Sequence, residues 1–251
     1  SRKLLNRYVD IEDIETEKLA KKLTEAGFEV EGISPLIIGT NLVVGHVLET
    51  EKHPQSDTLT ICQVDIGDGI EQIVCGAPNV AKGQSVVVAK IGAELKDLTI
   101  KPTEIRGVAS NGMICSLPEL GIDEKRLEAT DHAGIVVLND GKPGDDPRVV
   151  LGMDDEVFDI DLTSNRSDFL AMLSLAHEVA TLFERKLTLP EFENASQVGK
   201  ASKLKINSDT ENCTYFSGKV INKVTLKESP EWIKNALEAS GIRSINNVVD
   251  I

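Results

Sequence analysis

Two stretches of the sequence carry side chains that suit contact with a nucleic-acid backbone. The first, EKHPQSDTLT, begins at Glu51 and places Lys52 and His53 before a proline. The second, IKPTEIRGVASNGM, begins at Ile100 and concentrates two cations, a hydroxyl and an amide: Lys101, Arg106, Ser110 and Asn111. Such groups bind phosphates and sugars. Both stretches also suit ordinary turns, because Ser-Asn-Gly is typical of a hairpin and His-Pro can fix a turn.

Three stretches of the sequence begin like catalytic or cofactor-binding motifs, but each lacks a residue that the motif needs. The string HEVAT at His177 begins like a zinc-binding HExxH helix, but Thr181 stands where the second ligand belongs. The string DIGDGIEQ lacks the third glycine of a dinucleotide fingerprint, since Gln72 takes its place. Cys115 has no histidine nearby in the sequence to act as its base, so we interpret it as a buried small hydrophobe. The sequence offers no catalytic constellation.

The charge balance argues against sequence-indifferent coating of nucleic acid. The chain of 251 residues has a net charge of −14, whereas nonspecific binding to phosphates depends on cations that release counterions. Residues 40–150 hold ten basic and seventeen acidic residues, a net charge of −7. A local basic face remains compatible with this acidity, which otherwise indicates solubility.

Compartment signals are sparse. No apolar run reaches the ~18 residues of a membrane span, and the N-terminal SRKLLNRYVD lacks the apolar core of a signal peptide. The four cysteines form no CxxC pair. These features predict a reduced cytoplasmic protein without a membrane partner.

Periodicity divides the chain into segments. Leu19, Leu23 and their neighbours recur at helical spacing, and Gly27 is expected to end that helix. From about 41 to 140, short strands alternate with Gly, Pro and Asp, which favours a small antiparallel barrel or sandwich. Apolar parity switches near Cys62 and Gln63, which predicts a bulge in that strand.

The second half of the chain turns helical again from about residue 158, where SNRSDFLAMLSLAHEVATLFERK carries an apolar stripe. A polar linker is expected over 190–202. Beyond it, KLKIN and YFSGKVINKVTL are predicted strands, and a helix is predicted with Ser229 as N-cap, Pro230 at its first position and Gly241 as its end. The chain ends on SINNVVDI, which indicates a fragment of a longer protein.

Several long strings resemble a known family. GHVLETEKHPQSDTLTICQVDIGDG, IVCGAPNVAKGQSVVVAKIGAEL and IRGVASNGMICSLPELG resemble the tRNA-binding OB-fold domain of the endothelial-monocyte-activating-polypeptide type. The flanking YVDIEDIETEKLAKKLTEAGFEVEGI and FDIDLTSNRSDFLAMLSLAHEVATLF are similar to the bacterial phenylalanyl-tRNA synthetase β subunit. The final SPEWIKNALEASGIRSINNVVDI resembles the entry to its B3/4 editing region. Ser167 and Ser244 replace prolines of the family pattern.

The resemblance implies an α+β multidomain fold. An OB-fold barrel at 40–151 would be inserted into a discontinuous helical domain formed by 1–39 and 152–189. The linker 190–202 would lead to 203–251, the truncated start of an α/β B3/4-like domain. By motif, the implied tRNA-contact residues are Lys52, His53, Arg106, Ser110 and Met113.

The same resemblance implies a cytoplasmic α2β2 ligase that joins phenylalanine to its tRNA with ATP and Mg²⁺. The α subunit would hold the synthetic site, and the β subunit would bind tRNA and hydrolyse mischarged tyrosyl-tRNA. This fragment would hold no catalytic or metal residue and no cofactor of its own. Two alternatives stay open: a free-standing OB-fold tRNA-binding module, and a protein-docking barrel with little RNA contact.

Overall fold

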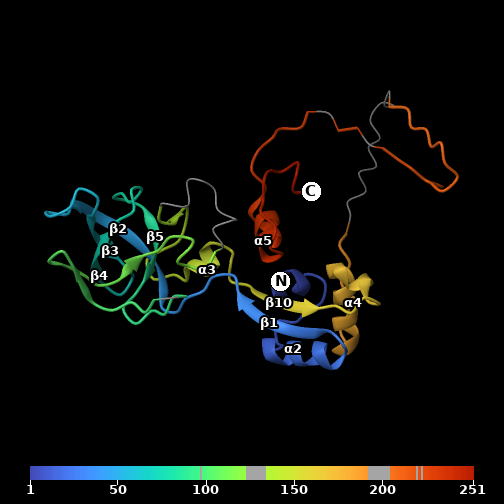
Figure 1. Cartoon of the computed structure of the whole chain (residues 1–251), viewed down its shortest axis with the longest axis horizontal. Helices are drawn as coiled ribbons and strands as arrows, with labels where there is room; N and C mark the ends of the chain where they lie inside the picture. Colours follow the sequence, from blue (N-terminus) through green and yellow to red (C-terminus); the bar gives the residue numbers. More distant parts are fainter. Residues whose placement is uncertain (97, 123–133, 192–203, 219, 222) are drawn as a thin grey trace.

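The computed structural model describes residues 1–96, 98–122, 134–191, 204–218, 220–221 and 223–251. Figure 1 shows a β-barrel on one side and a smaller unit of helices and two strands on the other. We call the smaller one the flanking unit; it consists of α1 (Arg2–Asn6), α2 (Thr16–Glu25), β1 (Glu29–Pro35), β10 (Glu156–Asp161), the 3-10 helix η2 (Ser167–Leu170) and α4 (Met172–Leu182). The barrel thus lies between the two halves of the flanking unit in the sequence.

The barrel is an antiparallel sheet in the order β4-β3-β2-β5-β8, with β9 also paired to β5. Its strands are β2 (Leu42–Lys52), β3 (Thr60–Asp65), β4 (Ile70–Cys75), β5 (Ser85–Ala89), β8 (Met113–Ile114) and β9 (Val137–Leu138). A separate hairpin of β6 (Thr103–Ile105) and β7 (Val108–Ser110) covers one opening. The predicted small antiparallel barrel is therefore confirmed.

The predicted bulge is in the wrong strand. Strand β3 pairs with β4 without interruption, and Cys62 and Val64 alternate into the core, both fully buried. The register instead shifts in β2, between Val47 and Glu49. The error arose because Cys62 was not counted as an inward hydrophobe, although a free buried cysteine packs as one.

One core joins the two halves of the flanking unit. Leu19, Leu23 and Phe28 from the first half pack in one cluster with Phe169 and Ala176 from the second. The Phe28 and Phe169 ring centroids lie 4.4 Å apart. The Arg166 guanidinium lies 3.9 Å from the Phe169 centroid and 5.0 Å from that of Phe28, close enough for cation–π attraction.

The flanking unit is not purely helical, which corrects the prediction. Strands β1 and β10 pair antiparallel from Glu29↔Asp161 to Pro35↔Glu156. Their polar, irregular sequences gave no clear strand period, and the pairing joins segments over 120 positions apart. A local pattern cannot report such a partner.

The C-terminal part of the chain contains one helix, α5 (Glu231–Ala239). A further short helix, α3 (Pro147–Val150), lies before β10 in the sequence. Helix α5 has Pro230 as its N-cap, one residue later than predicted. The strands predicted in KLKIN and YFSGKVINKVTL are absent from their described residues, which are extended without ladder partners. Most of the predicted linker, 192–202, lies outside the described residues.

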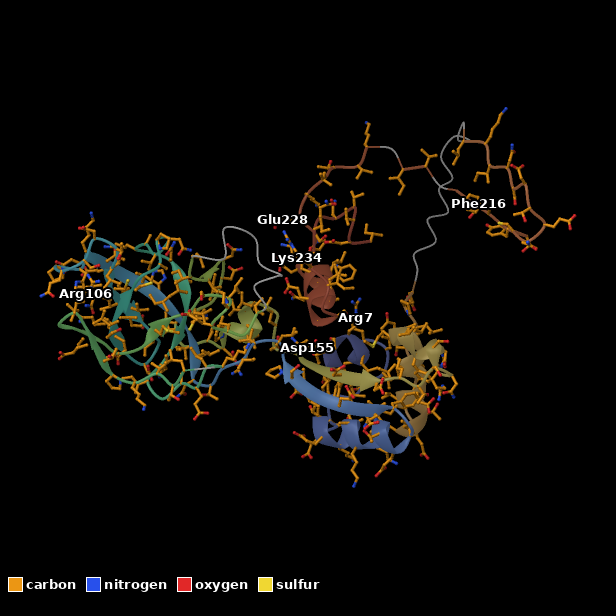
Figure 2. The ribbon with its side chains drawn as sticks, viewed as in Figure 1. Arg7, Arg106, Asp155, Phe216, Glu228 and Lys234 are labelled. Carbon is orange, nitrogen blue, oxygen red and sulfur yellow. The ribbon has the colours of Figure 1, made fainter. Side chains whose placement is uncertain are left out.

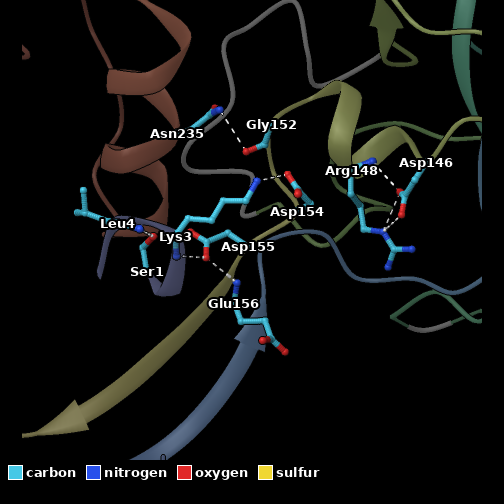
Figure 3. Close-up of polar contacts among 10 residues, drawn as sticks. All are labelled: Ser1, Lys3, Leu4, Asp146, Arg148, Gly152, Asp154, Asp155, Glu156 and Asn235. Carbon is cyan, nitrogen blue, oxygen red and sulfur yellow. Dashed lines mark hydrogen bonds and ion pairs between the residues drawn. The ribbon is translucent and has the colours of Figure 1, made fainter. Parts of the chain in front are cut away.

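Helix α5 contacts the flanking unit and the segment between α3 and β10, and Figure 2 shows it beside Arg7. The Arg7 guanidinium lies 5.3 Å from the centroid of the Trp232 ring, and Asn235 donates to the Gly152 carbonyl at 3.2 Å. Figure 3 shows the hydrogen bond from Asn235 to Gly152 near the buried Asp155, whose Oδ1 accepts the Lys3 N–H at 2.9 Å. The carboxylate therefore satisfies a free donor in the first turn of α1.

Gly45 offers a test of the barrel core. A Cβ there would lie 2.6 Å from Val88 Cγ2 and 2.7 Å from Val64 Cγ1. We expect Gly45→Ala to lower the free energy of unfolding by about 1–3 kcal/mol, because the added methyl group would overpack the core. Gly69→Ala is the matched control, since nothing lies within 4 Å of its added Cβ. Urea unfolding of both variants measures the difference, and equal stabilities would contradict the packing described.

Candidate nucleic-acid interface

Two hairpin turns meet at the outer end of the barrel, where Figure 2 shows Arg106. One joins β2 to β3, and the other joins β6 to β7 through Arg106 and Gly107. Both of these residues have positive φ, 49° and 78°, which is the backbone of a type I′ hairpin turn. The Arg106 Nη1 donates to the Gln55 carbonyl at 2.9 Å, so its side chain bridges the two turns.

His53 makes a second bridge between the turns. Its side chain is 4% exposed. The ring Nδ1 accepts the Gln55 N–H at 3.1 Å, and Nε2 lies 2.9 Å from the Ile105 carbonyl. Since a carbonyl only accepts, Nε2 carries the proton and the imidazole is the neutral Nε2–H tautomer. His53 therefore holds one turn against the other from inside.

Ser110 closes the barrel between β4 and β7. It is 1% exposed, and its Oγ accepts the Val74 N–H at 3.0 Å and donates to the Gly112 carbonyl at 3.3 Å. Gln72 continues this seam, because its side-chain amide donates to the Ala109 carbonyl at 2.8 Å. Side chains thus replace a regular strand ladder along this edge of β4.

A cavity of about 600 Å³ lies beside this seam. Met113 lies half-buried in its wall, on β8, and packs also against the barrel core. Lys101 and Glu119 are the charged residues among its described lining. The Glu119 Oε2 accepts both the N–H and the hydroxyl of Ser116 at 2.7 Å. The volume is within the range of ligand pockets.

Three exposed cations of the barrel segment lack acidic partners among the described residues. Lys52, Lys101 and Arg106 are exposed, and none forms an ion pair with a described carboxylate. By contrast, Lys90 pairs with Asp68 at 2.6 Å near the start of β2. Lys52 and Lys101 can therefore bind phosphates, as can the guanidinium nitrogens of Arg106 that do not bond Gln55, although the barrel as a whole is acidic.

The structure thus divides the five predicted site residues by position. Lys52 and Arg106 lie on the surface, Met113 lines the cavity, and His53 and Ser110 are buried in main-chain hydrogen bonds. The sequence reasoning missed Glu119. A signal was present, because Ser116 and Glu119 have the S-x-x-E spacing of a capping box.

The described residues show no alternative chemistry. Burial raises the pKa of the Cys62 and Cys115 thiols to about 12, so neither forms a thiolate near neutral pH. Within the described ranges, no three His, Cys, Asp or Glu side chains are grouped to hold a metal ion. Over the same ranges, no helix is long and apolar enough to cross a bilayer.

Comparison with known proteins shows what this chain is similar to. The model of a putative tRNA-binding domain matches residues 42–145, and that of the B3/4 domain matches residues 212–251. The chain is 46% identical, over 98% of its length, to the phenylalanine–tRNA ligase β subunit of Halalkalibacterium halodurans. The resemblance to phenylalanine–tRNA ligase β subunits is confirmed.

Further β subunits give the same alignment. Those of Shouchella clausii and Staphylococcus aureus are each 43% identical over the whole of this chain. The chain spans about a third of the length of these relatives, 31% of the first and 32% of the others. The match to the tRNA-binding domain includes all five predicted site residues.

Substitutions at the adjacent Lys52 and His53 distinguish a surface residue that can contact RNA from a buried residue that holds the turns together. We expect His53→Ala to lower the free energy of unfolding by about 2–4 kcal/mol, because the Gln55 N–H and the Ile105 carbonyl lose their partner. Lys52→Ala should change it by less than about 0.5 kcal/mol, as exposed substitutions do. Urea unfolding measures both stabilities. A His53→Ala variant as stable as Lys52→Ala would contradict the proposed role of His53 as a bridge between the two turns.

Proposed function

We propose that this chain is the tRNA-binding and scaffolding portion of a phenylalanine–tRNA ligase β subunit. The observation that carries the proposal is the group of unpaired cations, Lys52, Lys101 and Arg106, within the segment that matches a tRNA-binding domain. Cations of this kind bind phosphates and position an RNA without reading its sequence.

The predicted site residues take different roles in this proposal. Lys52 and Arg106 contact the RNA backbone, while Met113 lines the neighbouring cavity. His53 and Ser110 act as positioning residues, because their polar atoms bind the main chain of the surrounding hairpins. Their part in binding is to fix the turns that carry the cations.

The relatives support a wider assembly. We infer an α2β2 enzyme in the cytoplasm, in which an α subunit supplies the site for ATP, Mg²⁺ and phenylalanine. Within this chain, residues 40–151 would form the OB-fold domain inserted between 1–39 and 152–189. After the linker 190–202, residues 203–251 would begin the B3/4 domain, which the match at 212–251 supports.

A docking barrel with little RNA contact is the second candidate. The net charge of −7 over residues 40–150 favours it, since phosphates are repelled by distant carboxylates at low salt. A free-standing tRNA-binding module is less well supported, because the similarity to β subunits extends over both flanks of the barrel.

Salt dependence distinguishes RNA binding from docking. The chain is titrated with fluorescently labelled tRNA specific for phenylalanine at 50 and 200 mM salt. Three phosphate contacts should weaken binding by about 20-fold over that range. Undetectable binding at both salt concentrations would support the docking barrel instead.

Charge reversal tests which end of the barrel binds. Lys52→Glu and Arg106→Glu should each weaken tRNA binding roughly tenfold at about 0.1 M salt and reduce the salt slope by about one. The matched control is Lys142→Glu, an exposed lysine near the opposite end of β2, where Val44 bonds Asp145. Equal losses in all three variants would indicate a diffuse charge effect and no localised interface.

A further inference from the structure

The cavity beside Ser110 has no role in a purely phosphate-binding surface. Most of its wall is apolar, with Val74 from β4, Leu98 and Ile100 from the preceding loop, Ile105 from β6, and Met113 and Ile114 from β8. Leu98 is 51% exposed at its rim. Large exposed apolar side chains beside a hollow are typical of binding sites.

We propose that this cavity receives a single unpaired nucleobase of the bound RNA, with cytosine preferred to uracil. This inference rests on the proposed function, which supplies the RNA. The apolar walls suit the faces of a base, because proteins hold extruded bases between aromatic or apolar side chains. The described lining has no aromatic ring, so the polarisable thioether of Met113 and the aliphatic side chains would take that part.

The position of the cations supports a base in this cavity. Lys101 lines it, and Thr103 and Ile105 of β6 form the wall between Lys101 and Arg106. A nucleotide with its base inside would leave its phosphate near these cations at the rim. A phosphate inside is disfavoured, because the Glu119 carboxylate lies in the wall.

Glu119 provides the base preference. Both hydrogen bonds from Ser116 go to Oε2, and none of the hydrogen bonds among the described residues goes to Oε1. The carboxylate is therefore held in place with one oxygen able to accept from a ligand. Carboxylates accept from the N4 amino group of cytosine, whereas the O4 carbonyl of uracil would face the negative charge.

Blocking the cavity is the first test. Thr103 pairs with Ser110, and both line the cavity, whereas the next pair, Glu104 and Ala109, lies outside its lining. Thr103→Trp should weaken binding of the labelled RNA UUCUU about fivefold or more, since each stacked base contributes about 1–3 kcal/mol. Ala109→Trp places the same ring on the neighbouring exposed position and should bind as the unchanged chain does. Equal binding by the two variants overturns the proposal.

The methionine methyl groups report the base directly. The chain has three methionines: Met113 in the cavity wall, Met153 against the barrel core, and Met172 in the flanking unit. In protein labelled with ¹³C at the methionine methyls, UUCUU should shift the Met113 signal and leave that of Met172 unchanged. A Met113 signal that stays fixed at saturating RNA overturns the proposal.

The Glu119 preference has its own readout. UUCUU should bind about tenfold more tightly than UUUUU, and Glu119→Gln should remove that ratio without lowering the affinity for UUUUU. A ratio near one in the unchanged chain overturns the cytosine preference.

These outcomes separate the inference from the proposed function. If tRNA fails to bind at either salt concentration, the proposed function fails. If tRNA binds with the expected salt slope while Thr103→Trp and the Met113 methyl show no effect, the interface contacts phosphates alone and only the base cavity is refuted.

Discussion

The barrel depends on how its last edge is closed. Strand β4 has no regular ladder with β7 or β8 and is joined to them through the hydroxyl of Ser110, the side-chain amide of Gln72 and one main-chain hydrogen bond, from the Asn111 N–H to the Gln72 carbonyl at 2.8 Å. A buried serine that satisfies a strand N–H costs little, because its hydroxyl both accepts and donates. The cavity lies beside this closure, and its lining includes Val74 of β4, Ser110 of β7 and Met113 of β8.

The same closure brings exposed cations from two distant segments of an acidic barrel together. The hairpin of β6 and β7 is fixed to the turn after β2 through His53 and Arg106. This places Lys52 and Arg106, which come from two distant segments, close together. Salt screens charges beyond about 10 Å at 0.1 M, so a phosphate there interacts with these cations and with the exposed Glu51, Asp57 and Glu104 of the same hairpins, and little with carboxylates farther away.

The barrel was predictable because its strands carry local signals. Runs such as SVVVA combine β-branched residues with flanking Gly and Lys, and all lie within strands of the structure. The β1–β10 ribbon was missed because its partners are far apart in sequence. The predicted strands of YFSGKVINKVTL have the composition of strands and no partner among the described residues, since composition supplies a propensity and pairing needs a neighbour.

The sequence predicted which residues belong to the candidate site, but it did not predict which of them are exposed and which are buried. Motif similarity found Lys52, His53, Arg106 and Ser110 together, but their sequence context does not separate exposed cations from buried hydrogen-bonding groups. Burial of His53 is decided by Ile105, 52 positions later. Glu119 was overlooked among 41 acidic residues, because the S-x-x-E spacing from Ser116 indicates a local hydrogen bond and does not show that the carboxylate lies in a cavity wall.

One of the two prolines of the family pattern that this chain lacks shows how a different interaction can hold a turn. At position 244, where the pattern has proline, the Ser244 hydroxyl donates to the Asp250 carboxylate at 2.6 Å, and Ser229 donates to the same oxygen at 2.5 Å. These hydrogen bonds lower the pKa of Asp250 to about 2, with Ser229 as the largest cause. Proline fixes a turn by restricting φ, whereas here an ionised carboxylate joins the start of α5 to the turn that follows it. The turn is therefore held by hydrogen bonds between side chains, whereas a proline would hold it through the restricted φ of a single residue.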